Sequence, residues 1–149
     1  PGLPEDTQAR ELWRKISGLP EERIIACGAD DNFWRMGDTG PCGPCTEIHV
    51  DLGEDLRSAD GPSTPETDET RFLEIWNLVF MQFEQHADGS LTSLPAPSVD
   101  TGMGLERTAA AINDLAGPFE TDVIRPIINH LEALSGKTYT STPDATTDI

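Results

Sequence analysis

The segment formed by residues 72–83 limits the possible folds of this chain more than any other feature of its sequence. It reads Phe-Leu-Glu-Ile-Trp-Asn-Leu-Val-Phe-Met-Gln-Phe, with aromatic and β-branched residues at both odd and even positions. A strand that is apolar on both sides is buried on both sides, which places it inside a sheet rather than at an edge. The segment therefore predicts a central β-strand.

A tight turn follows this predicted strand. Asp88-Gly89 is typical of a hairpin turn, and it leads into a second predicted strand at residues 91–94. Side chains alternate between the two faces of a strand, so Asn77 and Val79 are expected to share one face of the first strand. One amide and one small aliphatic side chain are therefore expected to lie next to each other on that face.

Further elements are predicted on both sides of this hairpin. Apolar residues at helical spacing indicate a helix that Thr7 caps and Gly18 ends, and two more helices are expected over residues 103–115 and from position 121 or 122 to 134. Short strands are predicted at residues 24–27, 46–52 and 98–101. The remaining segments are expected to be an ordered loop rich in glycine and proline at residues 37–44, a mobile surface insertion at 53–70 and a severed linker at 137–149.

The overall charge excludes one class of function for this segment. The chain has 149 residues and a formal net charge of −17, from 27 acidic against 10 basic side chains. A surface that binds nucleic acid needs Lys and Arg, so this segment is not expected to bind nucleic acid by itself. We interpret the charge as a solvated acidic surface, with an acidic functional patch as the alternative. No apolar run approaches a membrane span and no secretory signal is visible, which predicts a soluble cytoplasmic protein with one core.

The cysteines do not indicate a disulfide framework. There are three, an odd number, in a chain with no secretory features. Cys42-x-x-Cys45 could on paper join Cys27 and His49 in a zinc site, but a single C-x-x-C motif is a weak signal. We expect Cys42 and Cys45 to pack as small apolar residues, and zinc is not expected in this segment.

The richest chemical pattern is Pro-Ser-Val-Asp-Thr-Gly-Met-Gly-Leu-Glu-Arg at residues 97–107. A buried Asp100 at a strand end can pair with an ammonium group, and Arg107 one turn into a helix can reach a phosphate. Gly102 and Gly104 let a ligand lie against bare backbone. Asp100 could instead cap the helix that follows it, and this alternative is left open here.

In order and spacing, this string together with residues 31–48 and 75–83 resembles the catalytic domain of alanyl-tRNA synthetases, and residues 97–107 resemble class II motif 3. The resemblance runs from about Pro4 to beyond Leu134. It implies that residues 1–149 are the C-terminal portion of a class II catalytic domain. The expected fold is α+β, with an incomplete antiparallel sheet flanked by helices.

The resemblance also implies an activity and its site. The parent enzyme would activate alanine with ATP and Mg²⁺ to alanyl-adenylate and transfer the alanyl group to tRNA(Ala), largely through segments outside this chain. No side chain here is assigned covalent catalysis or metal ligation. Glu47, Glu74 and Glu106 could approach Mg²⁺, and the sequence does not rank them. The substrate contacts implied are Trp34, Asn77, Val79, Asp100 and Gly102 for alanine, and Gly104 and Arg107 for ATP.

Part of the family pattern is not found in this sequence. Motif 1 and motif 2, whose arginine holds the α-phosphate of ATP, are not recognisable, so we expect an interior piece of a longer enzyme that is inactive alone. A synthetase-like paralogue without activity fits the same observation. A third alternative is a small zinc-binding interaction module built on Cys27, Cys42, Cys45 and His49.

Overall fold

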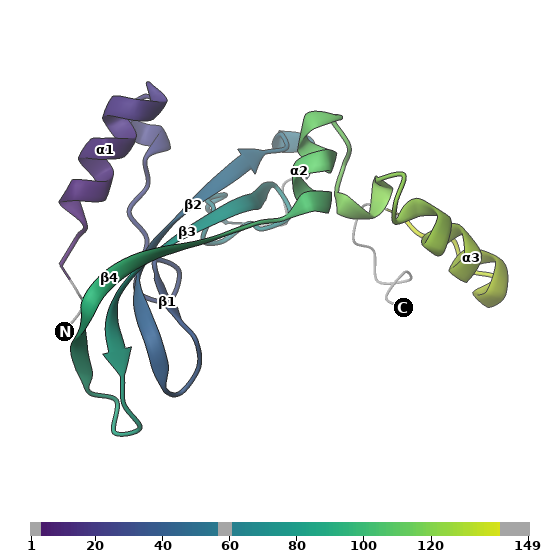
Figure 1. The fold of residues 1–149 in the computed structure, drawn as a ribbon. Helices are drawn as coiled ribbons and strands as arrows, with labels where there is room; N and C mark the ends of the chain where they lie inside the picture. The colour runs from purple at the N-terminus through teal and green to yellow at the C-terminus, as the bar shows by residue number, and fades with distance from the viewer. Residues whose placement is uncertain (1–3, 57–60, 141–149) are drawn as a thin grey trace. The chain divides into compact units, whose positions relative to one another are not determined.

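The computed structural model describes residues 4–56 and 61–140, which contain a four-stranded antiparallel sheet in the order β1-β2-β3-β4 (Figure 1). The strands are β1 (Phe33–Arg35), β2 (Gly40–Asp51), β3 (Phe72–Gln85) and β4 (Leu91–Met103). In the antiparallel β1–β2 pair, Phe33 lies opposite Pro44 and Arg35 opposite Cys42. With its helices this sheet confirms the predicted α+β class.

The α-helices are α1 (Thr7–Ser17), α2 (Leu105–Ile112) and α3 (Arg125–Ser135). The cap of α1 is Asp6 rather than the predicted Thr7, because the Asp6 carboxylate accepts a hydrogen bond from the Ala9 N–H at 2.9 Å. Gly18 and Gly136 end α1 and α3 in the left-handed conformation, with φ of 68° and 70°. The described residues also contain three short 3₁₀ helices: η1 (Glu21–Arg23), η2 (Glu54–Leu56) and η3 (Pro118–Glu120).

The chain divides into two compact units, and the long strands contribute residues to both. The first unit contains Pro1–Glu47 and Asn77–Gly102, and the second contains Ile48–Trp76 and Met103–Ile149. Phe33, Cys42, Cys45 and Val79 are buried in the first unit, where the Phe33 ring stacks on Phe83 with centroids 6.5 Å apart. Ala110 of α2 is buried in the second unit, in which η3 contacts both α2 and α3.

The predicted central strand and hairpin are confirmed. β3 lies between β2 and β4, and Gly89 takes a φ of 80° in the turn that joins β3 to β4. The predicted strand at residues 98–101 is only the end of β4, which continues through Pro95 and Pro97 from Leu91. A proline has no N–H for a sheet, but β4 stands last in the strand order, and an edge strand tolerates that loss.

Two further local predictions were wrong. Residues 24–27 form no strand, and Ile25 is 47% exposed rather than buried. Residues 37–44 were expected to be an ordered loop without regular structure, yet β2 begins at Gly40. Pairing with β1 overrides the local preference of Pro41 and Pro44 against regular structure. Gly43 is required by this arrangement, since a β-carbon there would lie 2.0 Å from the Phe80 carbonyl oxygen.

Arg71 organises the described part of the acidic segment at residues 53–70. Its guanidinium binds both carboxylate oxygens of Asp51, at 2.7 and 2.9 Å, and pairs with Glu54. The hydrogen bond to Asp51 is the main cause that raises the pKa of Arg71. The buried Asp68 carboxylate accepts from the Ser63 hydroxyl at 2.7 Å. The mobility of this segment stays a prediction, and residues 57–60 lie outside the described residues.

The last segment was predicted to be a linker. Of it, residues 137–140 are described, and the Tyr139 N–H donates to the Glu132 carboxylate at 2.8 Å. The Tyr139 ring also packs edge-on against Phe119, with centroids 6.0 Å apart. Residues 141–149 lie outside the described part of the chain.

Candidate aminoacyl-adenylate site

The residues predicted to bind alanine all fall in the first unit. Asn77 and Val79 are two residues apart on β3, so their side chains share a face, and Val79 is 6% exposed. Trp34 lies on β1 opposite Gly43 and is half-buried. These side chains supply one amide, one small aliphatic surface and one indole.

The Asn77 amide has one end paired and one end unpaired. Its Nδ2 donates a hydrogen bond to the Glu47 carboxylate on β2 at 3.0 Å. Its Oδ1 is buried, and within the described residues it has no hydrogen-bond partner. A buried carbonyl oxygen without a donor is destabilising by about 1–3 kcal/mol. This oxygen is therefore suited to accept a hydrogen bond from a bound N–H donor.

Asp100 lies near the end of β4, and its carboxylate is exposed rather than buried as expected. Its Oδ1 accepts from the N–H of Thr101 at 2.9 Å, and the Thr101 hydroxyl donates to the backbone carbonyl of Asn77 at 3.0 Å. These bonds hold the Asp100 segment against the strand that carries Asn77. The helix-capping alternative is wrong, because the N-cap of α2 is Gly104 and receives no side-chain cap. Gly102 is exposed, and a β-carbon there would meet nothing within 4 Å.

The two residues predicted to bind ATP lie in the second unit. The Gly104 N–H donates to the Ile75 carbonyl at 3.0 Å, which fixes the start of α2 against β3. A β-carbon at Gly104 would lie 3.2–3.3 Å from the aliphatic carbons of Arg107. Glycine thus lets the Arg107 side chain lie close along the helix entry.

Arg107 is held by one residue of β3. Its Nη1 donates to the Glu74 backbone carbonyl at 3.0 Å and approaches the Glu74 carboxylate at 3.2 Å. Both bonds use the same nitrogen, and the Arg107 side chain is 47% exposed. The other guanidinium nitrogens, Nε and Nη2, have no hydrogen bond within residues 4–56 and 61–140. They can therefore donate two hydrogen bonds to one phosphate.

The three candidate glutamates occupy different places. Glu47 holds the Asn77 amide, Glu74 pairs with Arg107, and Glu106 is half-buried in the first turn of α2. Mg²⁺ at nucleotide sites takes one or two carboxylates and several phosphate or water oxygens. Of the three, Glu74 is the glutamate that lies beside the Arg107 guanidinium, which was predicted to bind a phosphate.

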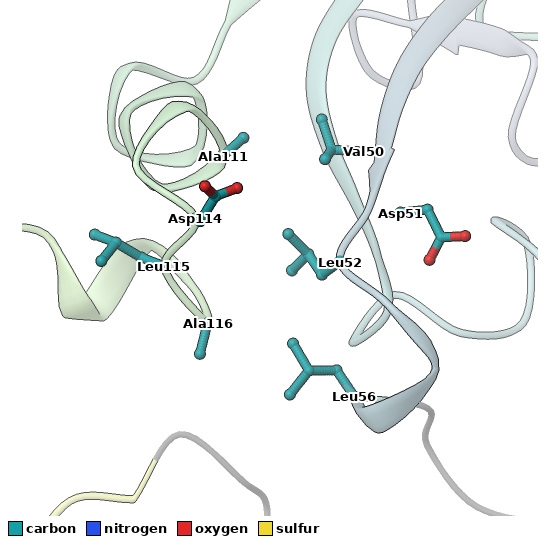
Figure 2. Close-up of a pocket in the computed structure, with 8 residues that line it drawn as sticks. All are labelled: Val50, Asp51, Leu52, Leu56, Ala111, Asp114, Leu115 and Ala116. Atoms are coloured by element: carbon teal, nitrogen blue, oxygen red, sulfur yellow. The ribbon is translucent and has the colours of Figure 1, made fainter.

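A cavity of about 360 Å³ lies in the second unit, and none of the predicted site residues lines it (Figure 2). Leu52 and Leu56 line one side, and Ala111 and Leu115 of α2 and the loop after it line the other. The Asp51 carboxylate in its wall is engaged by Arg71. The other lining side chains are aliphatic except Asp114, and none of the lining residues carries a positive charge that could bind a phosphate.

The cysteines and His49 have other contacts. Cys42 and Cys45 are buried as predicted, and burial is the main cause that raises the pKa of the Cys42 thiol. The Cys45 thiol donates to the Asp31 carbonyl at 3.4 Å, and His49 Nδ1 lies 3.3 Å from the Phe72 carbonyl. In the described residues no three His, Cys, Asp or Glu side chains gather as a metal site.

Sequence reasoning missed the pairing of Glu47 with Asn77. The alternation at residues 46–52 predicted a strand but not which residue of the next strand lies beside Glu47. Only the pairing of β2 with β3 shows it. None of the described helices combines the length and apolar character needed to cross a membrane.

Comparison with known proteins identifies the family. The family model described as tRNA synthetases class II (A) matches residues 3–149. Proteins named alanine–tRNA ligase are 54% identical over 94% of this chain in Desulfosudis oleivorans, 52% over 97% in Acidithiobacillus ferridurans and 53% over 87% in Francisella philomiragia subsp. philomiragia. The chain spans 16%, 16% and 15% of these relatives' lengths. This chain therefore belongs to the class II (A) tRNA synthetase family.

Proposed function

We propose that this chain supplies the amino-acid and part of the ATP contacts of a longer alanine–tRNA ligase. The observation that carries the proposal is the unpaired, buried Oδ1 of Asn77, on the same strand face as Val79. Thr101 holds the neighbouring Asp100 segment to the backbone of Asn77 itself. Two acceptors beside a small aliphatic wall suit an ammonium group next to a methyl group.

On the amino-acid side, the exposed Asp100 carboxylate pairs with the alanine ammonium. Val79 and Trp34 form the wall of the methyl pocket, and Gly102 leaves room for the substrate over the backbone. Such a wall rejects large side chains by overlap. It discriminates poorly against glycine and serine, since one methyl or hydroxyl changes binding by only about 1–3 kcal/mol. Such errors would have to be corrected at a site other than this pocket.

On the nucleotide side, Arg107 contacts the γ-phosphate and lies over the adenine, with Gly104 beneath. Glu74 orients Arg107 and offers the carboxylate that would hold Mg²⁺. When bound, Mg²⁺ neutralises negative charge on the phosphates. The chain's own contribution is position and charge rather than a covalent group.

The reaction has two displacement steps. An alanine carboxylate oxygen attacks the α-phosphorus of ATP, an O–P bond forms, and the bond to the bridging oxygen breaks to release pyrophosphate. A hydroxyl of the terminal tRNA ribose then attacks the alanyl carbonyl carbon and forms an ester bond. The bond from this carbon to the adenylate oxygen breaks, its electron pair leaves with AMP, and the hydroxyl proton passes to the departing phosphate. Asp100 keeps the ammonium fixed through both steps, which leaves the carboxylate free to react.

The net charge of −17 supports the proposal that tRNA(Ala) is gripped by segments outside this chain. We place the reaction in the cytoplasm, where tRNA and ATP are available. The 149-residue chain alone is proposed to be inactive, since the arginine of motif 2 that would hold the α-phosphate is not recognisable in its sequence.

The test is ATP–pyrophosphate exchange by a full-length protein that carries this sequence, with alanine, serine, glycine and a large amino acid compared. We expect exchange with alanine, weaker exchange with serine and glycine, and none with the large amino acid. The separate 149-residue chain should give none. No exchange by the full-length protein would instead support a paralogue without activity. Near-stoichiometric zinc in the purified chain would support the zinc-binding module.

A further inference from the structure

Glu47 and Asn77 lie side by side on neighbouring strands of the first unit. Asn77 Nδ2 donates to Glu47 Oε1 at 3.0 Å, and both side chains are partly buried. From the sequence alone, Glu47 was one of three glutamates that could approach Mg²⁺. In the structure its carboxylate instead contacts the amide of Asn77, which is proposed to bind alanine.

This contact decides which way the amide faces. An ionised carboxylate only accepts hydrogen bonds, so the amide nitrogen must face Glu47 and the amide oxygen must face away from it. A rotation of the amide by half a turn would bring Oδ1 against the carboxylate, where two acceptors repel each other. Within the described residues, the oxygen so oriented is buried and unpartnered.

We propose that Glu47 is a positioning residue, which fixes the Asn77 amide so that Oδ1 accepts a hydrogen bond from the alanine ammonium. The proposal rests on the function proposed above. An acceptor cannot bind the alanine carboxylate, so the ammonium is the substrate group that fits. Because Oδ1 is closed to solvent in this conformation, alanine binding includes a small side-chain shift that opens it.

The experiment measures ATP–pyrophosphate exchange by the full-length protein with Glu47→Ala and Glu47→Gln, while alanine and ATP are varied separately. Loss of one hydrogen bond to a charged group should raise the KM for alanine about tenfold in Glu47→Ala. Glu47→Gln should give a smaller rise, since its amide can present either an acceptor or a donor to Asn77. The KM for ATP should stay within about twofold in both variants.

A double-mutant cycle separates positioning from direct contact. If Glu47 acts only through Asn77, adding Glu47→Ala to Asn77→Ala should leave the KM for alanine unchanged within about twofold. Multiplicative effects of the two substitutions would overturn the proposal. So would an unchanged KM for alanine in Glu47→Ala, or a parallel rise for both substrates, which would indicate a role in folding or in Mg²⁺ binding.

Controls keep the outcomes distinct. Glu11→Ala removes an exposed carboxylate on α1 and should leave both KM values unchanged. If Glu47→Ala does not fold, Glu47→Gln has the same shape and carries the test alone, and an unchanged KM for alanine in it would then overturn the proposal. Lack of exchange by the unsubstituted protein would contradict the proposed function itself rather than the role of Glu47.

Discussion

Asp100 is a charged residue of the candidate site that makes few contacts with the rest of the chain. Its carboxylate is exposed, and its one described hydrogen bond is local, from the N–H of the next residue. An exposed side chain of this kind contributes little to folding, so a functional loss on substitution can be separated from a structural one. That separation makes Asp100 a direct probe of the proposed alanine site.

Replacement of Asp100 by Asn keeps the shape and removes the charge. We expect kcat/KM for alanine in pyrophosphate exchange to fall about 100-fold, since a hydrogen bond between charged groups contributes up to about 3 kcal/mol. The melting temperature should not change. Asp122→Asn, at another exposed position, is the matched control. Exchange within about twofold of the unsubstituted protein would remove Asp100 from the ammonium site.

Arg107→Lys tests the phosphate role of the guanidinium. Lysine keeps the positive charge but cannot bind Glu74 and a phosphate with one planar fork. We expect the KM for ATP to rise about tenfold while the KM for alanine stays within about twofold. Both constants come from exchange measured with the two substrates varied in turn. Equal effects on the two substrates would contradict this assignment.

At the level of elements, the approach of β2 to β3 depends on Gly43. A β-carbon there would lie 2.0 Å from a backbone carbonyl of β3, and backbone cannot move aside as a flexible side chain does. Gly43→Ala should therefore lower the free energy of unfolding by about 3 kcal/mol. Gly37→Ala, where nothing lies within 4 Å, should change it by less than about 0.5 kcal/mol. Urea unfolding of the two variants measures both values, and equal stability would contradict the close approach.

The same region shows why some elements were predictable and others were not. β3 was predictable because its apolar residues occupy both faces and Asp88-Gly89 marks the turn. The start of β2 was missed because its prolines and glycines argue locally against a strand, and only pairing with β1 stabilises it. The strand expected at residues 24–27 failed because apolar side chains there have no partner strand.

The roles of the candidate site residues stay predictions. Asp100, Gly104 and Arg107 stand close together in sequence, so a short string was enough to propose them. The contact between Glu47 and Asn77 joins residues 30 positions apart and depends on strand pairing, which no local pattern encodes. Similarly, the pairing of Arg71 with Asp51 spans 20 positions and was not predicted. Contacts between residues this far apart in the sequence become visible only in the folded structure.

At the scale of the whole molecule, the excess of negative charge affects the free energy of folding. The net charge is −17, and most acidic side chains in the described residues are exposed or half-exposed. Like charges repel one another more in the compact state than in the extended chain, so this excess opposes folding at low ionic strength. The ion pairs of Arg71 and Arg125 offset only part of it.

Salt should therefore stabilise the chain. Raising NaCl from about 10 mM to about 1 M shortens the screening length from ~30 Å to ~3 Å, so the melting temperature should rise steadily over this range. A variant with Glu11→Gln, Glu22→Gln and Asp30→Asn, all at exposed positions, should melt higher than the parent at low salt and equally at high salt. Differential scanning calorimetry on both proteins measures this. A melting temperature that falls with NaCl, or a variant with the same salt dependence as the parent, would show that attractive ion pairs outweigh the repulsion.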